Sequence, residues 1–227
     1  WKPAPFIISG AAALIMLGAF LYLRMGNGKL ITRAKNAPTN PVAYLGRFFQ
    51  QPRLIAGWLF AVIRSCGWWA YVVYLPIFAV ENGLQESLGG TLLSMTNAAL
   101  FLSPFMLRWM QRHSVRYAVR TGFMACAVLF GAASFGTPVP MYSVSLLFVG
   151  SFFLILLDIC AGLPFLMSVK PSERTEMSAV YSSYRDVSGI LTPGVAWLIL
   201  LAAPISGIFA AAGIASLLAW GIAGRLH

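Results

Sequence analysis

Hydrophobic runs of membrane-spanning length alternate with short polar or basic segments along the whole chain. Between Lys2 and Arg24 no residue is charged, and this length matches the roughly 20 residues that a helix needs to cross a bilayer. Further apolar runs occupy residues 54–80, 87–107, 121–135, 141–169, 171–201 and 205–224. The pattern therefore predicts an all-α fold, a polytopic membrane helix bundle of about seven transmembrane helices.

The segment between the first two predicted spans is polar and basic. Residues 25–53 carry several lysines and arginines, no acid, and a scatter of Gly, Asn and Pro. Inside this segment, residues 42–49 mix aromatic side chains with Arg47, a composition that predicts a short helix lying in the membrane interface. We therefore divide the chain into a transmembrane helix at 1–24, a cytoplasmic linker at 25–53 and a six-helix domain at 54–227.

Composition supports a membrane protein and explains the high positive charge. A hydrophobic fraction of 59% and a mean hydropathy of +0.78 are too high for an ordinary soluble domain. The formal net charge of +10 would also suit a nucleic-acid-binding protein, but 13 of the 16 lysines and arginines lie on the side that holds the linker. We therefore expect no nucleic-acid partner, an integral protein of the bacterial inner membrane, and a cytoplasmic C-terminus.

Cysteine and histidine provide no catalytic or metal-binding pattern. Cys66, Cys126 and Cys160 all lie in apolar runs and are odd in number, which argues against a disulfide framework. His113 stands among arginines and His227 ends the chain, so neither has neighbouring metal ligands. No paired carboxylates or nucleophile and base occur at bilayer depth, so we expect no metal, no cofactor and no enzymatic activity.

Four ionisable residues interrupt the apolar runs, and they lie at a similar depth. Counted from the cytoplasmic ends at about 1.5 Å per residue, they are roughly 12 to 16 Å inside the bundle: Arg64, Asp158, Arg185 and Asp186. One interpretation is a network of ion pairs that only fixes helix packing. The other is functional, with a cation that binds an anionic part of a substrate and a carboxylate that carries a coupling proton.

The run 171–201 is polar along one side at helical spacing. Its polar positions are Ser178, Tyr181 or Ser182, Arg185, Ser188 or Gly189, and Thr192. We expect Arg185 to face a cavity, and Asp186, about 100° further round the helix, to turn toward an adjacent helix. Trp68 and Tyr71, about one turn beyond Arg64, and Asn97 in the middle of the third run complete the set of candidate substrate contacts.

The last six spans divide into two triplets, and each triplet opens with a helix that bears one ionisable residue and one proline. These are Arg64 with Pro76, and Asp158 with Pro164. With the basic linker, this organisation resembles helices six to twelve of a major facilitator superfamily transporter. Residues 111–116 lie where that family has the loop motif D-R-x-G-R-R, with Gln111 in place of the acid, Ser114 in place of the glycine, and the arginines Arg112 and Arg116 retained.

The resemblance implies two inverted three-helix repeats and an alternating-access mechanism. It predicts a secondary active transporter of a small polar or amphipathic solute, proton-coupled and working as an antiporter or symporter, of the efflux type. The alternative is a non-transporting membrane partner or scaffold derived from half a transporter. The expected partners are a small-molecule substrate, the lipid bilayer, and either a missing N-terminal half or a second chain, because the charged face would otherwise meet lipid.

Overall fold

The computed structural model describes residues 4–23, 46, 48–136, 138–169 and 174–225, and all regular structure in these residues is helical. Five of the described helices are long and apolar enough to cross a membrane. The predicted all-α membrane bundle is therefore confirmed. The chain forms two compact units, residues 1–37 and residues 38–227.

The first unit contributes one apolar helix, α1, from Ala4 to Leu23. Its 20 residues would extend about 30 Å, the thickness of the hydrocarbon core of a bilayer. Apolar side chains point outward on every side, as in a helix that meets lipid rather than water. The first predicted span therefore corresponds to α1. The residues of the predicted linker from 25 to 45 lie outside the described part of the chain.

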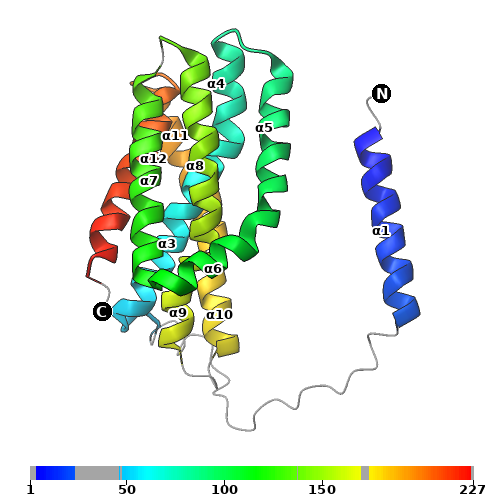
Figure 1. The fold of residues 1–227 in the computed structure, drawn as a ribbon, viewed down its shortest axis with the longest axis vertical. Coiled ribbons are helices and arrows are strands. Elements are labelled where there is room, and N and C mark those ends of the chain that lie inside the picture. The colour runs from blue at the N-terminus through cyan, green and yellow to red at the C-terminus, as the bar shows by residue number, and fades with distance from the viewer. Residues whose placement is uncertain (1–3, 24–45, 47, 137, 170–173, 226–227) are drawn as a thin grey trace. The chain divides into compact units, whose positions relative to one another are not determined.

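The second unit is a bundle of long helical rods that run up and down (Figure 1). Several rods consist of two or three helical pieces that follow one another directly. In chain order the pieces are α3 (Pro52–Trp69), η2 (Ala70–Tyr74), α4 (Leu75–Glu81), α5 (Glu86–Ala98), η3 (Ala99–Leu102), α6 (Ser103–His113), α7 (Val115–Phe135), α8 (Pro140–Cys160), α9 (Leu163–Ser168), α10 (Arg174–Ser182), α11 (Tyr184–Leu200) and α12 (Ser206–Ala223).

Prolines mark most of the breaks within the rods. Pro76 lies at the start of α4, directly after the π-helical turn η2, and Pro164 lies at the start of α9. A proline has no N–H to donate to the preceding turn, so the helix widens or restarts at these points. Pro104 is the second residue of α6 and follows the 3₁₀ turn η3 in the same way. Pro76 and Pro164 are the prolines of the helices that open the two predicted triplets, and each coincides with a break in its helix.

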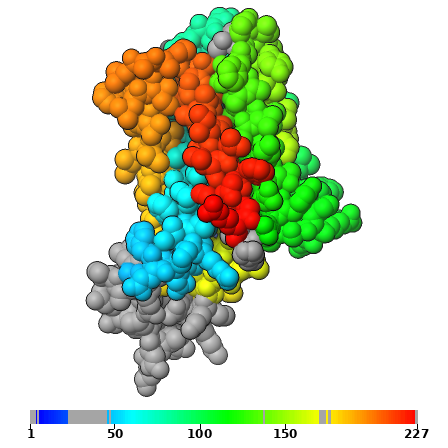
Figure 2. Space-filling model, turned by 90° about the vertical axis from the view of Figure 1, so that its left-hand side faces the viewer, coloured from blue at the N-terminus to red at the C-terminus, as the bar shows by residue number. Residues whose placement is uncertain are grey.

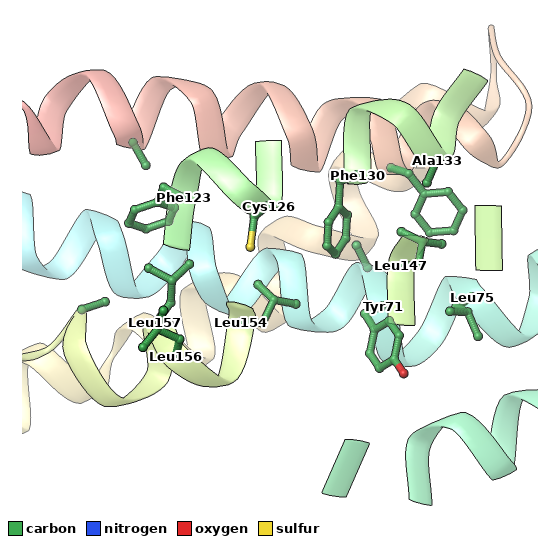
Figure 3. Close-up of a cluster of buried hydrophobic side chains, with 14 of the residues drawn as sticks. Tyr71, Leu75, Phe123, Cys126, Phe130, Ala133, Leu147, Leu154, Leu156 and Leu157 are labelled. Carbon is green, nitrogen blue, oxygen red and sulfur yellow. The ribbon is translucent and has the colours of Figure 1, made fainter. Parts of the chain in front are cut away.

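The centre of the bundle is a continuous hydrophobic core between α3, α7, α8 and α12. Helix α12 lies on the surface between α11 and α7 (Figure 2). Close contact between α7 and α12 depends on Gly213, where a Cβ atom would lie 3.0 Å from the backbone nitrogen of Gly131. Small residues of this kind let helix backbones approach closely in membranes. Figure 3 shows part of the core, in which Phe123, Phe130 and Leu154 are buried.

The two ends of the bundle differ in the charged residues that they carry. The turns after α4, α7 and α11 meet at one end, and Glu81 and Glu86 lie in or beside the first of them (Figure 1). The described arginines at the rod termini gather at the opposite end, and they are Arg53, Arg108, Arg112, Arg116, Arg120, Arg174 and Arg225. This separation supports the orientation expected from the positive-inside rule, which stays a prediction.

Two sequence-based boundaries were wrong. We expected a loop around Arg108, Arg112 and Arg116, but α6 continues to His113 and α7 begins at Val115, so only Ser114 separates them. Ser114 adopts a φ of 144°, and its hydroxyl caps α7 by accepting the N–H of Tyr117. This is the position that the resemblance assigns to glycine, the residue that tolerates such a φ best.

The run 171–201 is also not one helix. It is interrupted at Ser183, between α10 and α11, and the Ser183 hydroxyl donates to the carbonyl oxygen of Val180 at 2.7 Å. A serine that bonds to the preceding turn competes with the helical pattern. Of the predicted interfacial helix at 42–49, only Gly46, Phe48 and Phe49 are described, and Phe48 is buried in a protein cluster with Leu54 and Phe165.

Candidate functional site

An ion pair between two different rods forms the centre of the candidate site. Arg64 of α3 and Asp158 of α8 approach to 2.9 Å between Nη1 and Oδ1. The Arg64 side chain is only 13% exposed, whereas the Asp158 side chain is 55% exposed. Two of the four charges that were predicted at a similar depth therefore form a pair, with the cation enclosed by protein and the carboxylate still open on one side.

Tyr184, the first residue of α11, brings a second cation to this pair. Its hydroxyl oxygen accepts hydrogen bonds from Nη2 of Arg64 at 3.4 Å and from Nε of Arg185 at 3.2 Å. The two guanidinium carbons lie 5.6 and 5.7 Å from the centroid of the Tyr184 ring. Tyr184 thus lies between both arginines and interacts with each through its hydroxyl and its ring.

A buried polar contact fixes the spacing of the two helices that carry these cations. The Ser188 hydroxyl of α11 donates to the Ser65 hydroxyl of α3 at 2.7 Å, and Thr192 donates to the Ser188 carbonyl oxygen at the same distance. Hydroxyl groups that bond across helices are a common means of association in membranes. Ser188 and Thr192, predicted on the polar side of this run, therefore face α3 rather than an open space.

The charged groups border a cavity of about 360 Å³. Two guanidinium groups and one carboxylate face it, so its formal charge is positive. Apart from Ser65, the remainder of its wall is aromatic or aliphatic, a common design for sites that orient a small molecule by a few polar contacts. The lining residues are Arg64, Ser65, Trp68, Trp69, Leu100, Leu154, Ile155, Asp158, Tyr184 and Arg185.

Several candidate residues from the sequence lie elsewhere. Tyr71 is fully buried and its hydroxyl is 2.7 Å from that of Thr96, so it joins helices rather than lining the cavity. Asn97 follows Thr96 and is exposed outside the cavity lining. Tyr181 stacks on Phe165 with ring centroids 4.2 Å apart. None of these three predicted contacts borders the space that holds the ion pair.

Asp186 differs from our expectation in its environment. We expected it to turn toward an adjacent helix, but it is exposed in the second unit and does not line the cavity. Its neighbour Arg185 lines the cavity, as expected from the 100° step between consecutive helical residues. The four intramembrane charges therefore separate into a group of three around Tyr184 and one carboxylate outside it.

The residues of the loop motif form a separate feature at the arginine-rich end. Gln111 and Arg112 are exposed in the last turn of α6. Arg116 donates to the carbonyl oxygen of Gly224, the C-cap of α12, and so ties α7 to the end of that helix. A cation at a helix C-terminus also interacts favourably with the helix dipole. None of the three residues lines the central cavity.

Sequence reasoning missed Tyr184 and Trp69. Both are adjacent in sequence to a residue that it selected, Arg185 and Trp68 respectively. The available signal was the aromatic residue itself, since rings beside intramembrane arginines offer cation–π contacts. Which ring faces the arginines depends on the rotation of each helix about its axis, which the residue pattern does not determine to within one residue.

Apolar helices of spanning length, packed around a polar cavity with ionised walls, define a polytopic integral membrane protein. The profile of the Major Facilitator Superfamily matches residues 1–193, and the chain belongs to this family. It is thus a membrane transporter of the major facilitator type. Comparison with curated proteins gave no match, and comparison with solved structures gave none either.

Proposed function

We propose that the second unit forms one wall of the substrate path of a secondary active transporter, and that Arg64, Asp158, Tyr184 and Arg185 bind the solute. The observation that carries this proposal is the ion pair at 2.9 Å whose carboxylate is open to a cavity that also contains a second arginine. An ion pair that only fixes helix packing needs no charge beyond those of its two partners. Here Arg185 adds a positive charge that the described cavity wall does not balance.

The charge of the cavity favours an anionic solute with an apolar or aromatic body. Arg185 and Arg64 would bind its carboxylate or similar group, since guanidinium groups bind planar anions through paired hydrogen bonds. Trp68 and Trp69 would contact the apolar part. A volume of about 360 Å³ on this wall falls at the small end of ordinary ligand sites. The solute would therefore be small and amphipathic.

Proton coupling would operate through Asp158. An ionised Asp158 holds Arg64, whereas a protonated Asp158 would release it to bind the solute anion. Binding of a proton and binding of the anion would then favour the same state, which is the requirement for coupled movement. In this scheme the proton and the solute anion cross the membrane together. The direction of transport, including the export suggested by the sequence, depends on the imposed gradient.

The exposed side of this wall requires a second transmembrane unit. Asp158, Arg185 and Asp186 are all exposed in residues 38–227, and ionised groups that face hydrocarbon cost several kcal/mol. We propose that an N-terminal half of the transporter covers this side, with a second copy of the chain as the alternative. Flux from this chain alone, without a covering unit, would contradict this part of the proposal.

Proteoliposomes loaded with a pH-sensitive dye test the function. Purified full chain, with and without its covering half, would be exposed to a panel of aromatic carboxylates and the matching amines. We expect a carboxylate-dependent pH change that Asp158→Asn abolishes and that Asp186→Asn, the matched control outside the cavity, retains. Equal responses to amines would refute the anion preference. Carboxylate binding without any flux, in the presence of the covering half, would favour the non-transporting partner.

A further inference from the structure

A second cavity lies on the outer side of the bundle, apart from the proposed substrate path. It measures about 630 Å³ and is formed by α7, α8 and the end of α12. Its wall is almost entirely aliphatic or aromatic, with one charged side chain, that of Arg120. The lining residues are Tyr117, Arg120, Thr121, Met124, Ala125, Val128, Leu129, Val149, Phe153 and Trp220. We refer to this cavity as the α7 groove.

Arg120 has fewer hydrogen bonds than a guanidinium group in apolar surroundings needs. Its Nε atom is buried and has no hydrogen-bond partner among the described residues. Its guanidinium carbon lies 5.0 Å from the centroid of the Trp220 ring, a cation–π contact that holds the group in place without supplying a counter-charge. The Nε–H itself is enclosed by protein, so an anion in the groove would be bound by the remaining N–H groups of the guanidinium and would supply the counter-charge that Trp220 does not.

The groove has the dimensions of one lipid chain in one leaflet. Arg120 lies in the second turn of α7, and the apolar lining continues along the same helix to Leu129. Nine residues at about 1.5 Å each give a length of about 13 Å, close to half of the roughly 30 Å hydrocarbon core. The charged group is at the arginine-rich end of the bundle, where lipid head groups would lie.

We propose that the α7 groove binds an anionic phospholipid, with its phosphate on Arg120 and one acyl chain along α7. A purely apolar helix such as α1, which contains no acidic residue, could not supply the anion that Arg120 lacks. A phospholipid combines the anion and the apolar chain in one molecule. Further arginines at the same end, Arg108, Arg112 and Arg116, would attract anionic head groups to this region.

Native mass spectrometry of the full chain, titrated with phosphatidylglycerol or phosphatidylcholine after delipidation, tests this site. We expect phosphatidylglycerol to bind more tightly than phosphatidylcholine. Arg120→Gln should weaken phosphatidylglycerol binding about tenfold, since a charge-assisted hydrogen bond is lost. Arg174→Gln is the matched control, because it removes an exposed arginine of α10 from the same end outside the groove, and it should change binding by less than about twofold.

A second variant tests the apolar part of the groove separately from the charge of Arg120. Val128→Trp keeps Arg120 but adds bulk to the exposed apolar part of the groove, and it should also weaken phosphatidylglycerol binding. Inorganic phosphate, added at the same concentration, should not displace the lipid from the wild type. Unchanged lipid binding in both Arg120→Gln and Val128→Trp, equal binding of the two lipids, or displacement by phosphate would each overturn the proposal. Thermal unfolding of each variant confirms that a folded protein is compared.

Discussion

Neutralising the Arg64–Asp158 pair should give unequal losses of stability, because the two partners are unequally buried. Asp158→Asn leaves a guanidinium that is only 13% exposed, and its remaining described hydrogen bond is the 3.4 Å contact with Tyr184. Removing one partner of a fully buried pair costs about 3 to 5 kcal/mol. The carboxylate is 55% exposed and borders the cavity, so water in the cavity would weaken the pair, and we expect a cost of about 2 kcal/mol.

The reverse change should cost less. Arg64→Gln leaves a carboxylate that water can reach, so we expect a loss of about 1 kcal/mol in the free energy of unfolding. For a domain of this size, each kcal/mol lowers the melting temperature by about 2 to 4 °C. Asp158→Asn should therefore lower it by about 4 to 8 °C, and Arg64→Gln by about 2 to 4 °C.

The double variant decides whether the two side chains interact. It contains no unpaired charge at this position, so its loss of unfolding free energy should be smaller than the sum of the losses in the two single variants by about 1 kcal/mol. The measurement is thermal unfolding of the purified full chain in detergent at fixed pH and salt, with Asp186→Asn as the control for removal of an exposed carboxylate. Strictly additive losses would refute the coupling, and a larger loss in Arg64→Gln than in Asp158→Asn would refute the burial argument.

Gly213→Val should destabilise the bundle by about 1 to 3 kcal/mol, because its Cβ would meet the backbone of α7. In the same unfolding assay Gly221→Val should have a small effect, because a Cβ atom at Gly221 would meet nothing within 4 Å. Tyr184→Phe removes the hydroxyl that both arginines contact. We expect this variant to change the affinity for aromatic carboxylates about threefold to tenfold in equilibrium binding. An unchanged affinity would contradict a role of Tyr184 in the site. For topology, a cysteine at Gln111 should react with a membrane-impermeant reagent only from the cytoplasmic side and a cysteine at Gln85 only from the outside, so the reverse pattern would invert the proposed orientation.

The length of each apolar run determined much of the fold. A helix satisfies its own backbone hydrogen bonds, so an uncharged run of spanning length in a bilayer has few alternatives, and the spans near 54–80 and 205–224 were placed within a few residues. Two prolines were equally informative, because a missing N–H acts locally, although Pro193 lies inside α11 without ending it. Pro76 and Pro164 therefore marked real helix breaks before any tertiary contact was known.

The pairing of Arg64 with Asp158 was also accessible from the sequence, since ionised groups at one depth in an apolar bundle have few partners other than each other. Depth along a helix follows from counting residues, but direction around it is less certain. Thr96 faces the core and Asn97 does not, although both are polar and adjacent. A rotation of one residue is enough to exchange their roles.

Tertiary structure alone decided which groups complete the cavity. Tyr184 meets both arginines because α11 packs against α3, where the Ser65–Ser188 hydrogen bond joins the two helices. Arg120 is likewise one arginine among several in the sequence, and only the packing of α7 beside Trp220 buries its Nε. Composition and periodicity determine that a helix enters the membrane and how deep its charges lie, whereas contacts between distant segments determine what those charges face.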